Sequence, residues 1–208
     1  MVPRSTGRAV SPPSGVEPRR SAVLVLLVPS SADSTPEIPF IQRTDDGGPH
    51  ALQISLPGGR HEPGDRDAAA TALREAREEI GLATGRIDVL GTLSPLYIDV
   101  SNFLVTPVVA WRSGPTECDF WSRLSPQPSE VLRILHAPLR SLAASRAVRT
   151  VRARGYTLEA PSYLAGNDVV WGATATILAE LFMVTGLEDA HTPRGAPTAE
   201  EYPSRPQD

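Results

Sequence analysis

Lysine is absent from this sequence of 208 residues, so its 20 basic side chains are all arginines. Phosphate binding by a P-loop lysine, Schiff-base formation and proton abstraction by a lysine amine are therefore excluded. Cysteine occurs once, as Cys118, so no disulfide can form within the chain. A chain of this kind fits a reducing compartment, and we expect a cytoplasmic protein. No activating partner for the Cys118 thiol is evident beside it in the sequence, and we expect that residue to be structural.

Positive charge is also scarce, because 24 acidic side chains outnumber the 20 basic ones and leave a net charge of -4. A general nucleic-acid binder needs a basic surface to neutralise phosphates, so no nucleic-acid partner is expected. No apolar run approaches the roughly 20 residues that span a bilayer, so no membrane partner is expected. The run in "RRSAVLVLLVPSSA" (19–32) follows basic residues, as in a signal peptide, but it starts late and ends at a proline. We interpret it as a buried strand.

Segments rich in proline, serine, glycine and arginine flank an apolar middle. We expect disordered tails at 1–20 and 188–208, which lack apolar periodicity, and one domain at 21–187. The strands are not each separated by a helix, so the expected fold class is α/β, with helices packed on a mixed sheet. Strands are expected at 22–28, 38–43, 88–93 and 104–111, and helices at 67–80 and 173–184.

Three residues mark where these elements start, stop or bend. Asp65 or Asp67 can cap the helix at 67–80, and Gly81 stands where a left-handed residue would end it. Pro107 lies inside the strand at 104–111 and suggests a bulge or an edge position there.

The helix at 67–80 carries a concentration of carboxylates. Glu75, Glu78 and Glu79 are spaced i, i+3 and i+4, so their side chains project together and repel one another. A solvated ladder with Arg74 and Arg77 is one explanation. A divalent cation is the other, because Mg²⁺ and Mn²⁺ prefer oxygen ligands. The constrained Pro-Gly-Gly turn and the acidic loop in "LPGGRHEPGDRD" (56–67) favour the metal.

These residues resemble a known signature. The segment "REAREEIGL" (74–82) matches, at every fixed position, the Nudix box of the Nudix hydrolase superfamily. Gly59 and Asp65 lie one residue further from Arg74 than in the generic box. This longer spacing looks like that of the coenzyme A diphosphatase branch. The segment "HALQISLPGGR" (50–60) is similar to that branch's upstream element, with Leu52 in place of the usual glycine. Segments 95–111 and 168–178 also look like parts of this branch.

The resemblance implies a Nudix-type α/β/α sandwich around a mixed β-sheet. It implies hydrolysis of a nucleoside diphosphate derivative, assisted by Mg²⁺ or Mn²⁺, with coenzyme A or acyl-coenzyme A giving 3′,5′-ADP and a phosphopantetheine. A homodimer is compatible with it. The residues expected in the site are metal ligands Glu75, Glu78 and Glu79, catalytic Glu75, Glu79, Arg74 and Glu130, and substrate-binding Gly58, Gly59 and His50. Glu62 and Asp65 are further candidates in the loop, and Glu117 and Asp119 are alternatives to Glu130 as the downstream acid.

Two other functions stay open. A related enzyme would act on ADP-ribose, NADH or a nucleoside triphosphate, since Leu52 and the glycine-rich "TDDGGP" (44–49) leave the substrate undecided. A catalytically silent Nudix domain would instead bind a nucleotide or a partner protein. Silent domains commonly lose glutamates of the box, and all three are present here.

Overall fold

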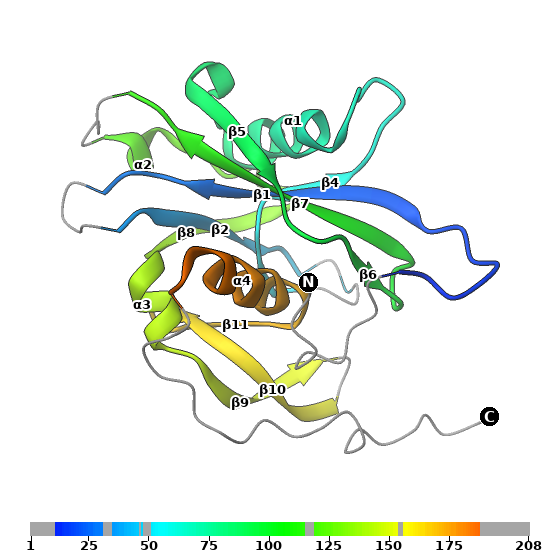
Figure 1. The fold of residues 1–208 in the computed structure, drawn as a ribbon. Helices are drawn as coiled ribbons and strands as arrows, with labels where there is room; N and C mark the ends of the chain where they lie inside the picture. Colours follow the sequence, from blue (N-terminus) through cyan, green and yellow to red (C-terminus); the bar gives the residue numbers. More distant parts are fainter. Residues whose placement is uncertain are drawn as a thin grey trace.

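The computed structural model describes residues 11–30, 35–45, 47, 51–114, 119–153 and 156–187 (Figure 1). Its strands are β1 (Arg19–Leu27), β2 (Glu37–Arg43), β3 (Ile54–Ser55), β4 (Gly58–Arg60), β5 (Ile87–Thr92), β6 (Leu96–Ile98), β7 (Phe103–Arg112), β8 (Val131–Pro138), β9 (Ala147–Ala153), β10 (Tyr156–Ala165) and β11 (Asp168–Trp171). Its α-helices are α1 (Ala68–Ile80), α2 (Phe120–Arg123), α3 (Leu139–Ala144) and α4 (Gly172–Thr185). A short 3-10 helix, Thr84–Arg86, precedes β5.

A mixed sheet forms the centre of the molecule. Strands β1 and β7 pair in parallel along their length, with Arg19 opposite Phe103 and Leu27 opposite Trp111. Strand β4 pairs antiparallel with β1, while β5 and β6 pair antiparallel with β7. The order β4-β1-β7-β5, with β6 beside β7, makes this the mixed sheet that the sequence predicts.

Two antiparallel sheets complete the fold, in the orders β3-β2-β8 and β11-β10-β9. Figure 1 shows α1 on one side of the mixed sheet, with β2, β8 and then α4 on the other side and β9, β10 and β11 beyond α4. The expected mixed α/β fold, with helices on both sides of a mixed sheet, is confirmed. The third sheet, β9 to β11, is an addition that the sequence did not predict.

Strand β1 is buried on both faces and divides two apolar clusters. Leu24 and Leu26 belong to the cluster under α1, whereas Val25 and Leu27 belong to the cluster beneath α4. This follows from the alternation of side chains along a strand, and it explains why the segment reads as a continuous apolar run. The interpretation of 19–32 as containing a buried strand is confirmed. Strand β1 begins at Arg19, two residues before the boundary expected for the domain.

The position predicted for Pro107 is wrong. Strand β7 lies inside the mixed sheet, and its irregular pairing occurs opposite Val89 and Gly91 rather than at Pro107. The carbonyl of Pro107 accepts a hydrogen bond from the N–H of Leu93 at 2.9 Å, so the missing N–H faces the same side. On that side pairing with β6 ends at Val105, and pairing with β5 begins only beyond Pro107. A proline fits there because the ladder needs no donor between the two partners.

Within the described residues, no helix combines the length and the apolar character needed to cross a membrane.

Candidate active site

Helix α1 begins and ends at capping residues. The side chain of Asp67 accepts a hydrogen bond from the backbone N–H of Ala70 at 2.8 Å, as an N-cap residue does. Gly81 ends the helix in the left-handed conformation, with φ of 66°. The helix predicted at 67–80 is therefore confirmed. Of the two capping candidates, Asp67 has the role, and Asp65 has other partners.

The buried side of α1 determines where its glutamates lie. Ala72, Ala76 and Ile80 are fully buried at helical spacing, in the same apolar cluster as residues of β1. Glu75 and Glu79 each precede a member of this stripe by one position, so they lie at its edge, where α1 meets β4. The packing of α1 on the sheet thus brings two carboxylates against the Pro-Gly-Gly turn.

Glu79 is the most deeply buried of the three glutamates, with 2% of its surface exposed. One carboxylate oxygen, Oε2, accepts a hydrogen bond from the backbone N–H of Gly58 at 2.8 Å. The other, Oε1, lies 3.9 Å from Nη1 of Arg43. Burial raises the pKa of Glu79 to about 7; the Gly58 N–H and Arg43 lower it in part, and the charges of Glu75 and Glu130 raise it further. The carboxylate therefore lacks a full counter-charge.

Glu75 lies against Gly59. A Cβ atom on Gly59 would stand 2.6 Å from the Glu75 carboxyl carbon, closer than atoms can pack. Gly58 is more strictly constrained, since its φ is 152° and a Cβ there would meet a backbone atom, the Ala22 carbonyl oxygen, at 2.3 Å. Burial raises the pKa of Glu75, and the ion pair with Arg74 offsets part of that rise. Gly59 thus leaves room for the Glu75 carboxylate, and Gly58 lets the turn pass close to the backbone of β1.

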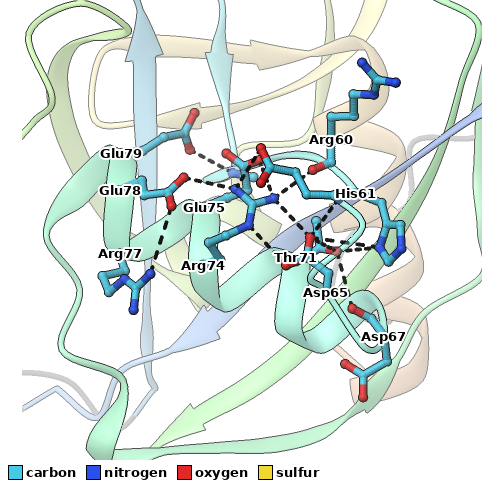
Figure 2. Close-up of polar contacts among 12 residues, drawn as sticks. Arg60, His61, Asp65, Asp67, Thr71, Arg74, Glu75, Arg77, Glu78 and Glu79 are labelled. Atoms are coloured by element: carbon cyan, nitrogen blue, oxygen red, sulfur yellow. Dashed lines mark hydrogen bonds and ion pairs between the residues drawn. The ribbon is translucent and has the colours of Figure 1, made fainter.

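Arg74 joins the glutamates of α1 to the preceding loop (Figure 2). Its Nη2 lies 3.1 Å from Glu75 Oε1, and its Nη1 donates to Glu78 Oε2 at 3.0 Å. Glu78 is 52% exposed at its side chain and also lies 4.0 Å from Arg77. The expected contacts of Arg74 with the helix glutamates are therefore present. They orient Glu75 and Glu78 while Glu79 is held separately by Gly58.

Asp65 anchors Arg74 from the loop side. Nε and Nη2 of Arg74 donate to the two carboxylate oxygens of Asp65, each at 3.1 Å, and Nη2 also donates to the Arg60 carbonyl at 2.8 Å. Asp65 further accepts hydrogen bonds from the Thr71 hydroxyl and the Glu62 N–H, each at 2.9 Å. The hydrogen bonds from Arg74 are the main cause that holds the pKa of Asp65 well below its ordinary range. The loop from 60 to 67 is thereby closed onto α1.

The downstream segment brings one of the three candidate acids to this site. The N–H groups of Ser125 and Gln127 donate to the last carbonyls of α1, those of Ile80 and Glu79, at 3.0 and 2.8 Å. Glu130 follows on an exposed turn, and its charge contributes to the raised pKa values of Glu75 and Glu79.

Of the other two candidate acids, the structure describes only Asp119. Asp119 pairs with Arg123 at 2.7 Å, one helical turn away on α2. Glu117 lies outside the described residues, as does Cys118.

The upstream element is described only in part. His50 lies outside the described residues, so its expected role stays a prediction. Leu52 has φ of 59°, in the left-handed region that glycine favours. Its carbonyl accepts a hydrogen bond from Nε2 of Gln42 at 3.2 Å. Gln42 in turn accepts from Nε of Arg133 at 2.7 Å, and Arg133 pairs with Asp168 at 2.5 Å, so β2, β8 and β11 support this turn together.

The chemistry of the donors fits a divalent metal. Carboxylate oxygens are the ligands that Mg²⁺ and Mn²⁺ prefer, and the excess negative charge around Glu79 is what a cation would offset. Over the ranges that the structure describes, no three acidic, histidine or cysteine side chains already stand together as a metal site. Arg74 holds Glu75 and Glu78 in ion pairs, so a metal bound there would compete with Arg74 for them.

Sequence reasoning missed Arg43. It lies at the end of β2, more than 30 residues before the box, and contacts Glu79 only through the fold. A signal was available in the sequence, because alternation along a strand places Arg43 on the same face as Ile41. Ile41 belongs to the apolar cluster beneath α1, so this face is the one that meets the helix.

Comparison with known proteins gives three findings. The model of the NUDIX domain family matches residues 18–136. A protein of Pectobacterium atrosepticum, named Uncharacterized Nudix hydrolase NudL, is 33% identical over 172 residues, which cover 82% of this chain and 86% of that protein. A protein of the same name from Photorhabdus laumondii is 32% identical over 158 residues, covering 75% of this chain and 81% of that protein.

Among solved structures, the crystal structure of a Nudix hydrolase from M. smegmatis, RenU, aligns with a TM-score of 0.54. The alignment covers 84% of this chain and 90% of that one, at 15% identity. At this identity the likeness concerns the fold alone, and it is the fold described above.

Proposed function

This chain belongs to the Nudix hydrolase family, and from that premise we propose that it hydrolyses the diphosphate bond of coenzyme A or acyl-coenzyme A. The products would be 3′,5′-ADP and a phosphopantetheine. The observation that carries the proposal is the fit between the Gly58–Gly59 turn and the glutamates of α1. One glycine holds Glu79 through its N–H, and the other leaves room for the carboxylate of Glu75.

Glu75, Glu78 and Glu79 would hold the metal, Mg²⁺ or Mn²⁺. When bound, such a cation polarises a diphosphate, offsets the charge that develops on it and lowers the pKa of a bound water. The chain's own part begins with orientation. Gly58 fixes Oε2 of Glu79 and leaves Oε1 as the outer oxygen, while Arg74 directs Glu75 and Glu78. Asp65 keeps Arg74 in place through two hydrogen bonds, so the loop and helix form one rigid support.

Glu130 is the best-placed group to take the proton from the attacking water. It is exposed, and its charge is felt by both Glu75 and Glu79. In the reaction, the water oxygen bonds to one phosphorus and the bridging P–O bond breaks. The proton passes to the Glu130 carboxylate, and the second phosphate departs with the bridging oxygen. Glu75 and Glu79, which would hold the metal, belong to the same catalytic site.

Two features support coenzyme A as the substrate. The loop from Gly59 to Arg74 is one residue longer than the generic box, a spacing that resembles the coenzyme A diphosphatase branch. Leu52 adopts the left-handed conformation that glycine favours, so the backbone at this position is compatible with the glycine of that branch. The expected cytoplasmic location and homodimer stay predictions.

ADP-ribose, NADH and nucleoside triphosphates are the competing substrates. Leu52 is 47% exposed, at a position where the resembling branch has a glycine and therefore no side chain, so its side chain is available to change the fit of a ligand. We therefore propose to compare kcat/KM for coenzyme A, an acyl-coenzyme A and these three compounds, with Mg²⁺ and with Mn²⁺, identifying products by mass spectrometry. We expect the highest value for coenzyme A or its ester, with 3′,5′-ADP released. A higher value for another compound would replace the substrate, and metal-dependent binding without turnover would indicate a silent domain.

A further inference from the structure

Arg43 reaches the active site from the opposite sheet. It is the last residue of β2. It lies two positions after Ile41, whose side chain is buried in the apolar cluster beneath α1. Pairing between β2 and β8 shifts register between Gln42 and Arg43, where Arg43 lies opposite Val131. The extra residue at this irregularity, Leu132, belongs to β8, so β2 keeps its alternation and Arg43 lies on the same face as Ile41. The guanidinium of Arg43 thereby lies beside Glu79.

The backbone around Arg43 is anchored on both sides of the site. Its own N–H donates to the carbonyl of Gln53 at 3.1 Å, in the segment that leads to the Pro-Gly-Gly turn. The N–H of Thr44 donates to the carbonyl of Glu130 at 3.0 Å, and the Thr44 hydroxyl donates to Ser129 at 3.2 Å. Arg43 therefore stands at a fixed place between the glycine turn and the downstream acid.

The guanidinium of Arg43 has few protein partners. Within the part of the chain that the structure describes, its only polar side-chain contact is the one with Glu79, and 3.9 Å is too long for a hydrogen bond. Its side chain is 32% exposed. Arg74 differs in both exposure and partners. Its side chain is 16% exposed, and its donors are used by Asp65, Arg60 and Glu78. Arg74 is built to support the site, whereas the donors of Arg43 face it.

A cation at this place opposes metal binding by Glu79, because it already offsets part of the carboxylate charge and would repel a divalent ion. The same cation is favourable once an anionic ligand enters. A diphosphate carries several oxygen acceptors, and the planar fork of a guanidinium can bind two of them at once. An arginine beside the metal carboxylates, with donors that no described residue accepts by a side-chain hydrogen bond, has the chemistry of a phosphate-binding group.

We propose that Arg43 binds the non-bridging oxygens of the substrate diphosphate and turns from Glu79 to the ligand when the site is filled. The inference rests on the proposed function, and it adds a binding residue outside the Nudix box. It also implies two opposite effects of a single side chain: Arg43 weakens metal binding in the absence of a ligand, and it strengthens diphosphate binding in the presence of metal.

The test measures both effects without turnover. Mn²⁺ affinity is determined by electron paramagnetic resonance on the protein alone, for wild type, Arg43→Gln and Arg43→Lys. Affinity for methylenediphosphonate, which has no hydrolysable bridge, is then determined by calorimetry at saturating Mn²⁺. Arg140→Gln is the matched control, because it makes the same change of charge at an exposed position on α3, outside the site.

For Arg43→Gln we expect Mn²⁺ to bind about threefold to tenfold more tightly, since a nearby positive charge is removed. We expect methylenediphosphonate to bind at least about tenfold more weakly, since charge-assisted hydrogen bonds are lost. Arg43→Lys should keep the wild-type Mn²⁺ affinity and recover only part of the diphosphonate affinity, because an ammonium lacks the fork. Arg140→Gln should match wild type in both.

Two results would overturn the inference. Weaker Mn²⁺ binding by Arg43→Gln would mean that Arg43 supports the position of Glu79 instead of opposing the metal. Diphosphonate affinity within about twofold of wild type would mean that no phosphate contact exists. If wild type itself shows no metal-dependent diphosphonate binding, the proposed function fails. If wild type binds normally and the variant does too, only the role of Arg43 fails.

Discussion

Replacing Glu79 by glutamine should stabilise the metal-free protein at neutral and higher pH. The pKa of Glu79 rises from an ordinary 4.5 to about 7 in the folded state, chiefly because the carboxyl group is buried. A raised carboxyl pKa means that folding favours the protonated form. The contribution of the Glu79 carboxyl to the free energy of unfolding is complete below pH 4.5 and is lost as the pH rises through about 7. At pH 8 the wild-type protein therefore folds against the cost of an ionised, buried carboxylate.

The size of this effect follows from the shift. A difference of about 2.5 pKa units corresponds to about 3 kcal/mol, which is the upper limit of the gain. Glutamine can keep the hydrogen bond from Gly58, but its amide N–H₂ is then buried beside Arg43 and lowers the gain to about 1 to 3 kcal/mol. Near pH 5 the gain should fall below about 1 kcal/mol, because the wild-type carboxyl is then protonated in the folded state and only its ionisation in the unfolded chain still lowers stability.

The assay is urea unfolding, followed by circular dichroism, of metal-free wild type and Glu79→Gln at pH 5 and pH 8. Glu180→Gln is the matched control, since Glu180 is also buried on a helix, with 6% exposed, but already accepts hydrogen bonds from the Ser94 N–H at 3.0 Å and hydroxyl at 2.7 Å. We expect the control to lose stability at both pH values. If Glu79→Gln is no more stable than wild type at pH 8, then Glu79 is not short of a counter-charge and the reasoning fails.

Three further variants test the support of the site. Asp65→Asn should lose about 2 to 3 kcal/mol of unfolding free energy at pH 7. The loss should shrink below pH 3.8, because a carboxyl whose pKa is lowered stabilises the fold only above that range; a pH-independent loss would contradict this. Leu52→Gly should raise the free energy of unfolding in urea by up to about 1 kcal/mol, because it removes a side chain from a left-handed backbone position. A free energy of unfolding below that of wild type would argue against strain. Gly59→Ala should reduce kcat at least about tenfold with little change in Tm, since the atoms nearest the added Cβ belong to the Glu75 carboxyl, which would be displaced from Arg74 without a shift of the backbone; wild-type kcat would exclude the contact.

The sequence predicts the local parts of the site well. The extent of α1 follows from its apolar spacing and from two capping signals, Asp67 and Gly81, that act within a few residues of one another. Helical geometry alone predicts that Glu75, Glu78 and Glu79 project from one side of the helix; in the fold Glu75 and Glu79 lie against the glycine turn, while Glu78 stays largely exposed. The Pro-Gly-Gly motif also predicts a constrained turn that needs Gly58 and Gly59. That these glycines approach the β1 backbone and Glu75 becomes visible only in the fold.

Features that depend on distant segments are not predictable in this way. Pro107 looks like an edge residue until the gap between β6 and β5 is known. Asp67 rather than Asp65 caps the helix. The carboxylate of Asp65 instead accepts two hydrogen bonds from Arg74, a contact that the sequence does not reveal. Alternation along β2 places Arg43 on the face of Ile41, but only the fold shows that this face meets α1, because β2 and α1 enclose the same apolar cluster.

The central claim is that the glutamates of α1 hold a divalent metal. It is tested most directly by titrating metal-free protein with Mn²⁺ and measuring the free ion by electron paramagnetic resonance. Wild type and Glu180→Gln should bind alike, whereas Glu79→Gln should bind at least about tenfold more weakly, because one charged ligand is lost. Equal Mn²⁺ affinity in wild type and Glu79→Gln would contradict the claim.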